Sequence, residues 1–241
     1  MEIQGILFDK DGTLLEFDRT WRPVVNRIIG EILLEHQLPE TIRSTLGEAI
    51  GLYPDRIDPQ GSLSCGTNRD VAEDLLKILG NQVSKEDFVT WSTRAFDRVA
   101  AELPVYPVAG ALELMENLRK EGIRIGLSTA DSVENATFFL QKTGLYPYFD
   151  FIGADDGVVN PKPAVDYMLN FCSLYGFSPK DVAVVGDTLT DMTFGKNSGA
   201  GLRIGVLSGT GTRELLAPHA DLVTDGIGNL WTGDGFLWEV L

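Results

Sequence analysis

Residues 3–8 form an apolar run that ends abruptly in polar residues. The run reads as a buried strand, and it leads directly into Asp9, Lys10, Asp11, Gly12 and Thr13. Strands buried on both faces belong to parallel sheets, which hold their ligands at the carboxyl ends of the strands. The pattern therefore predicts that Asp9 and Asp11 lie at a ligand-binding edge of a sheet.

The pattern then turns helical, with no convincing strand between residues 20 and 103. Apolar residues at 28–34 recur at helical spacing after Pro23, a residue that suits the first turn of a helix. Further helices are predicted at residues 40–51, 69–79 and 85–102. Residues 53–68 are rich in Pro, Gly, Ser and Asp and read as a loop. We therefore predict a helical domain at residues 16–104, inserted after the first strand.

Beyond Pro107 the pattern alternates between apolar runs of strand length and amphipathic segments of helical length. The predicted strands are residues 123–127, 149–153, 182–185, 202–206 and 222–223. The predicted helices are residues 109–120, 132–142, 164–175 and 191–198. Such alternation builds an α/β fold, a doubly wound Rossmann-like parallel sheet that the first strand completes. Residues 1–15 and 105–241 are thus expected to form a core domain.

Composition narrows the range of partners and compartments. Of 241 residues, 44% are hydrophobic and 23% charged, as in an ordinary globular protein. The net charge of −15 argues against nucleic acid or an anionic membrane as the main partner. No apolar run approaches the roughly 20 residues of a membrane span. With only two cysteines and no visible signal peptide, we expect a cytoplasmic monomer or homodimer that acts on a small molecule.

Polar groups also follow the later strands. Each has an ordinary structural explanation as a helix cap, a turn residue or a solvated charge. Because parallel strands end at one edge of a sheet, however, we interpret the set as functional. The residues are Thr129 and Asp131, Lys162 between two prolines, and Asp187 with Asp191. The Gly-rich segment at 205–211 lacks the Lys of a P-loop, and we interpret it as a mobile surface loop.

The residue types in this set suit phosphoryl transfer. Asp9, Asp187 and a backbone carbonyl offer the hard oxygen ligands that Mg²⁺ prefers. Thr129 and Lys162 can bind phosphate oxygens. A carboxylate at Asp9 can attack phosphorus to give an aspartyl-phosphate. Asp11 can protonate the leaving oxygen and later deprotonate water, as general acid and then general base.

In their order along the chain, these motifs resemble those of the haloacid dehalogenase-like (HAD) superfamily. The motifs are Asp9-Lys10-Asp11-Gly12-Thr13-Leu14, Thr129, Lys162-Pro163 and Gly186-Asp187-Thr188-Leu189-Thr190-Asp191. The helical insert resembles that superfamily's C1 cap. The resemblance implies that Asp9 is the nucleophile and Asp11 the acid and base, and that Thr129 and Lys162 bind the phosphoryl group. It also implies that Asp187 binds Mg²⁺ with Asp9 and the Asp11 carbonyl, and that Asp191 supports the metal or orients Lys162.

Within the superfamily, Asp11 argues for a phosphatase, because dehalogenases carry a non-acidic residue at that position. The chain looks most like phosphoglycolate phosphatase-like members, so the implied substrate is a small phosphomonoester, phosphoglycolate-like or a sugar phosphate. Ala130 departs from the Asn that relatives often have, which leaves its backbone N–H as the phosphate-binding group.

Two other functions fit the same residues. A phosphosugar mutase of this fold would pass the phosphoryl group from Asp9 back to a sugar. A phosphoacceptor signalling domain also clusters Asp, Lys and Mg²⁺, although such domains usually lack the second carboxylate and the large insert. Arg69, in the polar loop at residues 61–69, is a candidate specificity residue, and the ordinary alternative is a loop in which Thr67 or Asn68 caps the next helix.

Overall fold

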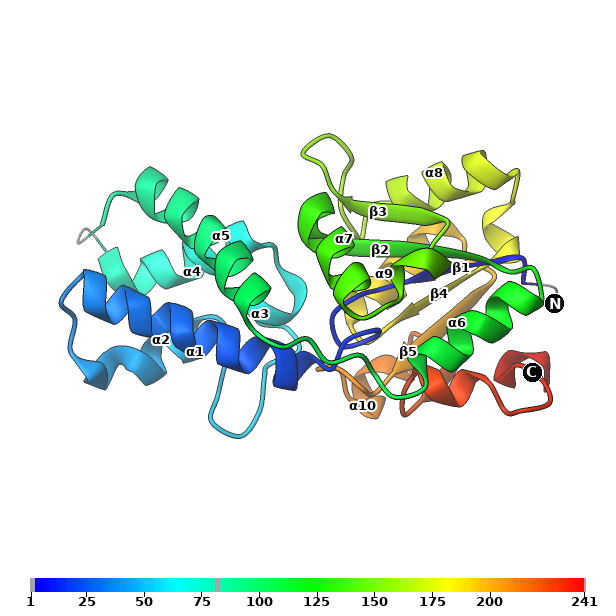
Figure 1. The fold of residues 1–241 in the computed structure, drawn as a ribbon, viewed down its shortest axis with the longest axis horizontal. Coiled ribbons are helices and arrows are strands. Elements are labelled where there is room, and N and C mark those ends of the chain that lie inside the picture. Colours follow the sequence, from blue (N-terminus) through cyan, green and yellow to red (C-terminus); the bar gives the residue numbers. More distant parts are fainter. Residues whose placement is uncertain (1–2, 81–82, 241) are drawn as a thin grey trace. The chain divides into compact units, whose positions relative to one another are not determined.

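The computed structural model describes residues 3–80 and 83–240. The chain divides into two compact units (Figure 1). One comprises the residues up to Phe17 together with those from Val105 onward, and the other comprises Asp18–Pro104.

Six described strands form one parallel sheet in the first unit, in the order β3-β2-β1-β4-β5-β6. Their bounds are β1 (Gly5–Phe8), β2 (Arg124–Ser132), β3 (Phe151–Asp155), β4 (Val182–Gly186), β5 (Leu202–Val206) and β6 (Leu222–Thr224). Chain connections leave β1 in opposite directions along the sheet, which creates the crevice where doubly wound sheets bind ligands. The α/β, Rossmann-like fold class is confirmed.

Alternate residues of the buried strands pack into two separate cores, one on each face of the sheet. Ile6 and Phe8 pack with residues of α6 (Ala111–Lys120) and α7 (Val133–Lys142). Leu7, between them in sequence, packs on the opposite face with α8 (Asp166–Tyr175) and α9 (Leu189–Ser198). Because side chains alternate along a strand, one continuous apolar run supplies both faces.

The second unit contains only helices among its described elements. They are α1 (Phe17–Glu35, beginning at the boundary), the short 3-10 helix η1 (Glu40–Ile42), α2 (Arg43–Ala49), α3 (Ser62–Cys65), α4 (Asn68–Leu79) and α5 (Lys85–Glu102). The prediction for α5 is confirmed to the residue. The prediction for Pro23 is wrong, because the residue lies inside α1 rather than in its first turn. Short helix α3 interrupts the segment that was predicted to be a loop.

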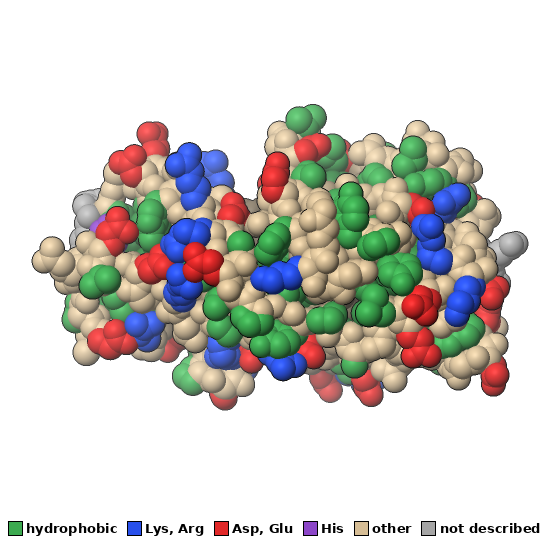
Figure 2. All heavy atoms as spheres, viewed as in Figure 1, with side chains coloured by type: hydrophobic (Ala, Val, Ile, Leu, Met, Phe, Trp, Pro, Cys, Tyr) green, Lys and Arg blue, Asp and Glu red, His purple; other side chains and the backbone are tan. Residues whose placement is uncertain are grey.

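Surface charge is mixed. On the face shown in Figure 2, acidic and basic side chains are interspersed rather than gathered into one basic patch. In the second unit, for example, Arg27 pairs with Glu102 at 2.6 Å and Arg98 pairs with Glu31 at 2.5 Å. Among the described helices, none has the length and apolar character needed to cross a membrane.

Candidate functional site

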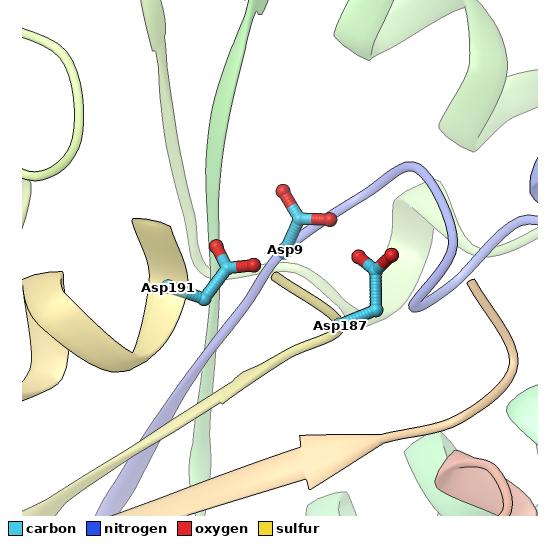
Figure 3. A group of neighbouring side chains, drawn as sticks. All are labelled: Asp9, Asp187 and Asp191. Carbon is cyan, nitrogen blue, oxygen red and sulfur yellow. The ribbon is translucent and has the colours of Figure 1, made fainter. Parts of the chain in front are cut away.

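Three carboxylates meet at the carboxyl edge of the sheet (Figure 3). Asp9 directly follows β1, Asp187 directly follows β4, and Asp191 lies in the first turn of α9. One oxygen from each lies within 4.8 Å of the others. Adjacent parallel strands β1 and β4 thus bring together groups far apart in the chain, as expected from the strand ends.

Lys162 joins two of these carboxylates. Its Nζ donates to Asp9 Oδ1 at 2.7 Å and to Asp191 Oδ1 at 2.5 Å, and its side chain is 5% exposed. Burial by itself would lower the pKa of Lys162, but the carboxylates of Asp191 and Asp9 outweigh burial and raise the pKa above its usual range. Lys162 is therefore a fixed cation beside the carboxylate of Asp9.

Asp191 uses its two oxygens for different tasks. Oδ2 accepts hydrogen bonds from the backbone N–H of Thr188 at 3.0 Å and from its hydroxyl at 2.6 Å, which closes the cap of α9. Oδ1 is left to accept from Lys162. Because the helix cap fixes this carboxylate, Asp191 can hold Lys162 in position.

Asp187 is fully buried beneath the loop that follows β5. Its Oδ2 accepts hydrogen bonds from the Thr210 N–H at 2.8 Å and from the Thr210 hydroxyl at 3.3 Å. A Cβ built on Gly209 would lie 1.9 Å from this oxygen, and one built on Gly12, where φ is +86°, would lie 2.5 Å from it. Only glycine allows such close backbone approach. The interpretation of this segment as a mere surface loop is therefore wrong, because it packs on Asp187.

Asp11 belongs to a second network. Its Oδ2 lies 2.9 Å from Nζ of Lys10, which also donates to Asp131 Oδ2 at 2.7 Å. Burial would lower the pKa of Lys10, but the two carboxylates outweigh it and raise the pKa. The sequence pattern singled out neither Lys10 nor its pairing, since Asp131 is 121 residues away.

Thr129 and Ala130 lie near the end of β2, which runs through Ser132 and is longer than predicted. The Thr129 hydroxyl accepts a hydrogen bond from the Asp131 N–H at 3.2 Å, and its proton remains available to a ligand. Neither Thr129 nor Asp131 caps α7, because the Ser132 hydroxyl accepts from the Asn135 N–H.

Arg69 lies in the second unit, on α4. Its side chain is 71% exposed, and its Nε lies 3.5 Å from Glu73. Thr67 caps this helix in a reciprocal capping box with Asp70, as the structural alternative for this loop predicted. A role for Arg69 in specificity stays a prediction.

The electrostatics of the carboxylate cluster favour a bound cation. Burial, with the charges of Asp191 and Asp11 adding to it and Lys162 opposing it, raises the pKa of Asp9 to about 7. Burial, together with the charges of Asp9 and Asp191, raises the pKa of Asp187 well above its usual value. Hard carboxylate oxygens held this close suit a small divalent cation such as Mg²⁺, which would relieve their mutual repulsion.

Comparisons with known proteins identify the family to which this chain belongs. A phosphoglycolate phosphatase of Nitrosospira multiformis is 27% identical over 201 residues, covering 83% of this chain and 82% of that relative. A pyrophosphatase, PpaX, of Halalkalibacterium halodurans is 27% identical over 199 residues, covering 83% and 81%. The crystal structure of a predicted phosphoglycolate phosphatase from Haemophilus somnus superposes on this chain with a TM-score of 0.74. The two sequences are 18% identical, and the match covers 95% of this chain and 97% of that chain. The sequence profile of the haloacid dehalogenase-like hydrolases matches residues 3–199, and the chain belongs to this family of enzymes.

Proposed function

We propose that this protein is a Mg²⁺-dependent phosphatase that hydrolyses a small phosphomonoester through a phosphorylated Asp9. One observation carries the proposal. The Asp9 carboxylate lies at the end of β1, bonded to the fixed cation of Lys162 and close to Asp187 and Asp191. A carboxylate held in place beside a cation is suited to attack an electrophilic phosphorus.

Asp9, Asp187 and the backbone carbonyl of Asp11 would hold the Mg²⁺. The ion would supply positive charge that neutralises the phosphoryl oxygens as they approach three carboxylates. Asp191 supports these ligands indirectly, because its two oxygens already accept hydrogen bonds from Thr188 and Lys162.

The reaction divides into two steps. In the first, an oxygen of Asp9 forms a bond to phosphorus while the bond to the ester oxygen breaks, and Asp11 gives its proton to that oxygen. In the second, Asp11 takes a proton from water, whose oxygen bonds to phosphorus and releases Asp9 and inorganic phosphate. Lys162, the Thr129 hydroxyl and the Ala130 N–H would bind the phosphoryl oxygens throughout.

The leaving group must be chosen outside this set, because every residue in it handles the phosphoryl group or the metal. We propose that the helical unit at residues 18–104 is a C1 cap with this task. Names of relatives suggest two substrate classes, phosphoglycolate and pyrophosphate. If Arg69 contributes, Arg69→Ala will reorder the preference among natural phosphate esters and leave p-nitrophenyl phosphate hydrolysis nearly unchanged. An unaltered preference would assign specificity to other cap residues.

Release of inorganic phosphate from a panel of esters tests the proposal. The panel should include 2-phosphoglycolate, pyrophosphate, hexose phosphates and p-nitrophenyl phosphate, each with and without Mg²⁺. Multiple turnovers that require Mg²⁺ support a phosphatase. Interconversion of hexose phosphates without net phosphate release would instead indicate a mutase, and absence of turnover on every ester would contradict the assignment.

A further inference from the structure

Lys10 is a buried cation that the proposed chemistry does not use. It is 0% exposed, although it stands between the two carboxylates of the first motif. Its Nζ contacts Asp11 at 2.9 Å, Asp131 at 2.7 Å and the face of the Phe139 ring, whose centroid is 3.9 Å away. A charge removed from water this completely is costly unless every direction offers a partner.

Asp131, one of the two carboxylates that Lys10 contacts, is held in place by further hydrogen bonds. Asp131 Oδ1 accepts hydrogen bonds from the Ser132 N–H at 2.9 Å and from Asn135 Nδ2 at 3.2 Å. Its other oxygen accepts from Lys10. Asn135 and Phe139 both lie on α7, so the start of that helix holds the Lys10 ammonium in place.

Asp11, the other carboxylate that Lys10 contacts, is partly exposed to solvent. The side chain of Asp11 is 21% exposed, whereas that of Lys10 is not exposed at all. A substrate can therefore meet Asp11 but cannot touch Lys10, so Lys10 can influence the reaction only through the carboxylates that it contacts, Asp11 and Asp131.

We propose that Lys10 is a positioning residue for the general acid, and that Asp131 and Phe139 hold it in that role. Its ammonium lies 2.9 Å from the Asp11 carboxylate and fixes the position of that carboxylate. Without it, repulsion from the neighbouring carboxylates would leave Asp11 in several orientations, and proton transfer to the leaving oxygen would suffer. This inference rests on the proposed role of Asp11.

Lys10→Met tests the inference, because methionine fills similar space without charge or donors. The measurement is kcat/KM in the full-length protein for a series of aryl and alkyl phosphates. Alkyl alkoxides need protonation to leave and p-nitrophenolate does not. We expect a loss of about 100-fold on alkyl phosphates and of less than about 5-fold on p-nitrophenyl phosphate.

Two further variants keep the test decisive. Lys142→Met is the matched control, because the exposed Lys142 also stands over a phenylalanine of α7, Phe138, at 5.0 Å and is far from Asp11 in sequence. This variant should leave the activity on both classes of substrate unchanged. If Lys10→Met fails to fold, Asp131→Asn weakens the anchor at constant size and should give the same selective loss, reduced to about 10-fold.

Asp11→Asn separates this inference from the proposed function. If Asp11→Asn shows the selective loss and adding Lys10→Met to it changes nothing more, Lys10 acts through Asp11. If Asp11→Asn is selective but the Lys10 and Asp131 variants lose activity equally on all esters, only the inference about Lys10 is overturned. If Asp11→Asn itself is not selective, the acid role fails, and the inference fails with it.

Discussion

Two buried lysines, Lys10 within the first motif and Lys162 beside it, each join a pair of aspartates. Lys162 bridges Asp9 and Asp191, and Lys10 bridges Asp11 and Asp131. The pairs differ in access. The side chains of Lys162 and Asp9 are 5% and 13% exposed. The side chain of Lys10 is not exposed, whereas that of its partner Asp11 is partly exposed.

This difference separates two kinds of contribution. A cation at the ligand-binding edge can contact a phosphoryl group directly, so its removal should lower kcat/KM by a similar factor for every substrate. A buried cation bonded to the general acid is proposed to act by orienting that acid. The loss of activity on its removal should therefore depend on how much the leaving group needs a proton. The predictions below test this contrast, from the largest expected effect to the smallest.

Asp9→Asn should abolish turnover, with a loss of about 10⁴-fold or more for every ester, because the amide is not a nucleophile. Phosphate release measures the loss. The same variant should raise the melting temperature in the absence of Mg²⁺, because it removes a carboxylate whose pKa is raised to about 7 by burial. Substantial turnover in a folded Asp9→Asn protein would remove Asp9 as the nucleophile.

Lys162→Met should lower kcat/KM by about 100- to 1,000-fold, by a similar factor for alkyl and p-nitrophenyl phosphates, because it removes charge from the phosphoryl group rather than from the leaving oxygen. Comparing this uniform loss with the selective loss in Lys10→Met is the sharpest test of the contrast. If the loss in Lys162→Met depended on the leaving group, Lys162 and Lys10 would not have separate roles.

Mg²⁺ should stabilise the protein more at high pH than at low pH. Raised pKa values of Asp9 and Asp187 mean that the metal-free folded state binds more protons than the unfolded state, so its stability falls as pH rises from about 4 to about 7. Mg²⁺ replaces those protons and removes the loss. At about 100 times the dissociation constant, we expect a stabilisation of about 3 kcal/mol at pH near 7, measured by thermal denaturation.

Asp187→Asn is the control for this effect, since it removes one ligand and one raised pKa together. The Mg²⁺-dependent increase in melting temperature should shrink in this variant. An increase that is equal at acidic and neutral pH in the parent protein would show that the ion binds elsewhere.

Thr210→Val should have the smallest effect. It removes the hydroxyl that bonds to Asp187 at 3.3 Å and keeps the backbone N–H that bonds at 2.8 Å. We expect Mg²⁺ affinity, measured by calorimetry, to fall by about 3- to 10-fold. Thr212→Val, in the same loop but serving as the cap of α10 (Arg213–Leu216), should leave the affinity unchanged.

Local sequence was enough to predict the sheet and most helices of the second unit, although β2 continues to Ser132, beyond its predicted end at residue 127. An apolar run buried on both faces needs a parallel sheet, and a polar residue directly after such a run must lie at the sheet edge. The positions of Asp9 and Asp187 followed from this rule. The capping role of Thr67, one of the alternatives for its loop, followed instead from its residue type and its place before a helical pattern. Pro23 shows its limit, because a long amphipathic helix formed through a residue that by itself favours a helix start.

Only the tertiary structure decided which charges meet. The pairing of Lys10 with Asp131 spans 121 residues, and the bond from Thr210 to Asp187 spans 23. A lysine beside two aspartates reads as a solvated surface charge until the packing of α7 removes its water, and a glycine-rich segment reads as a loop until its backbone touches a buried carboxylate. Both contacts depend on burial, and burial arises from how distant segments pack rather than from the residues next to them in sequence.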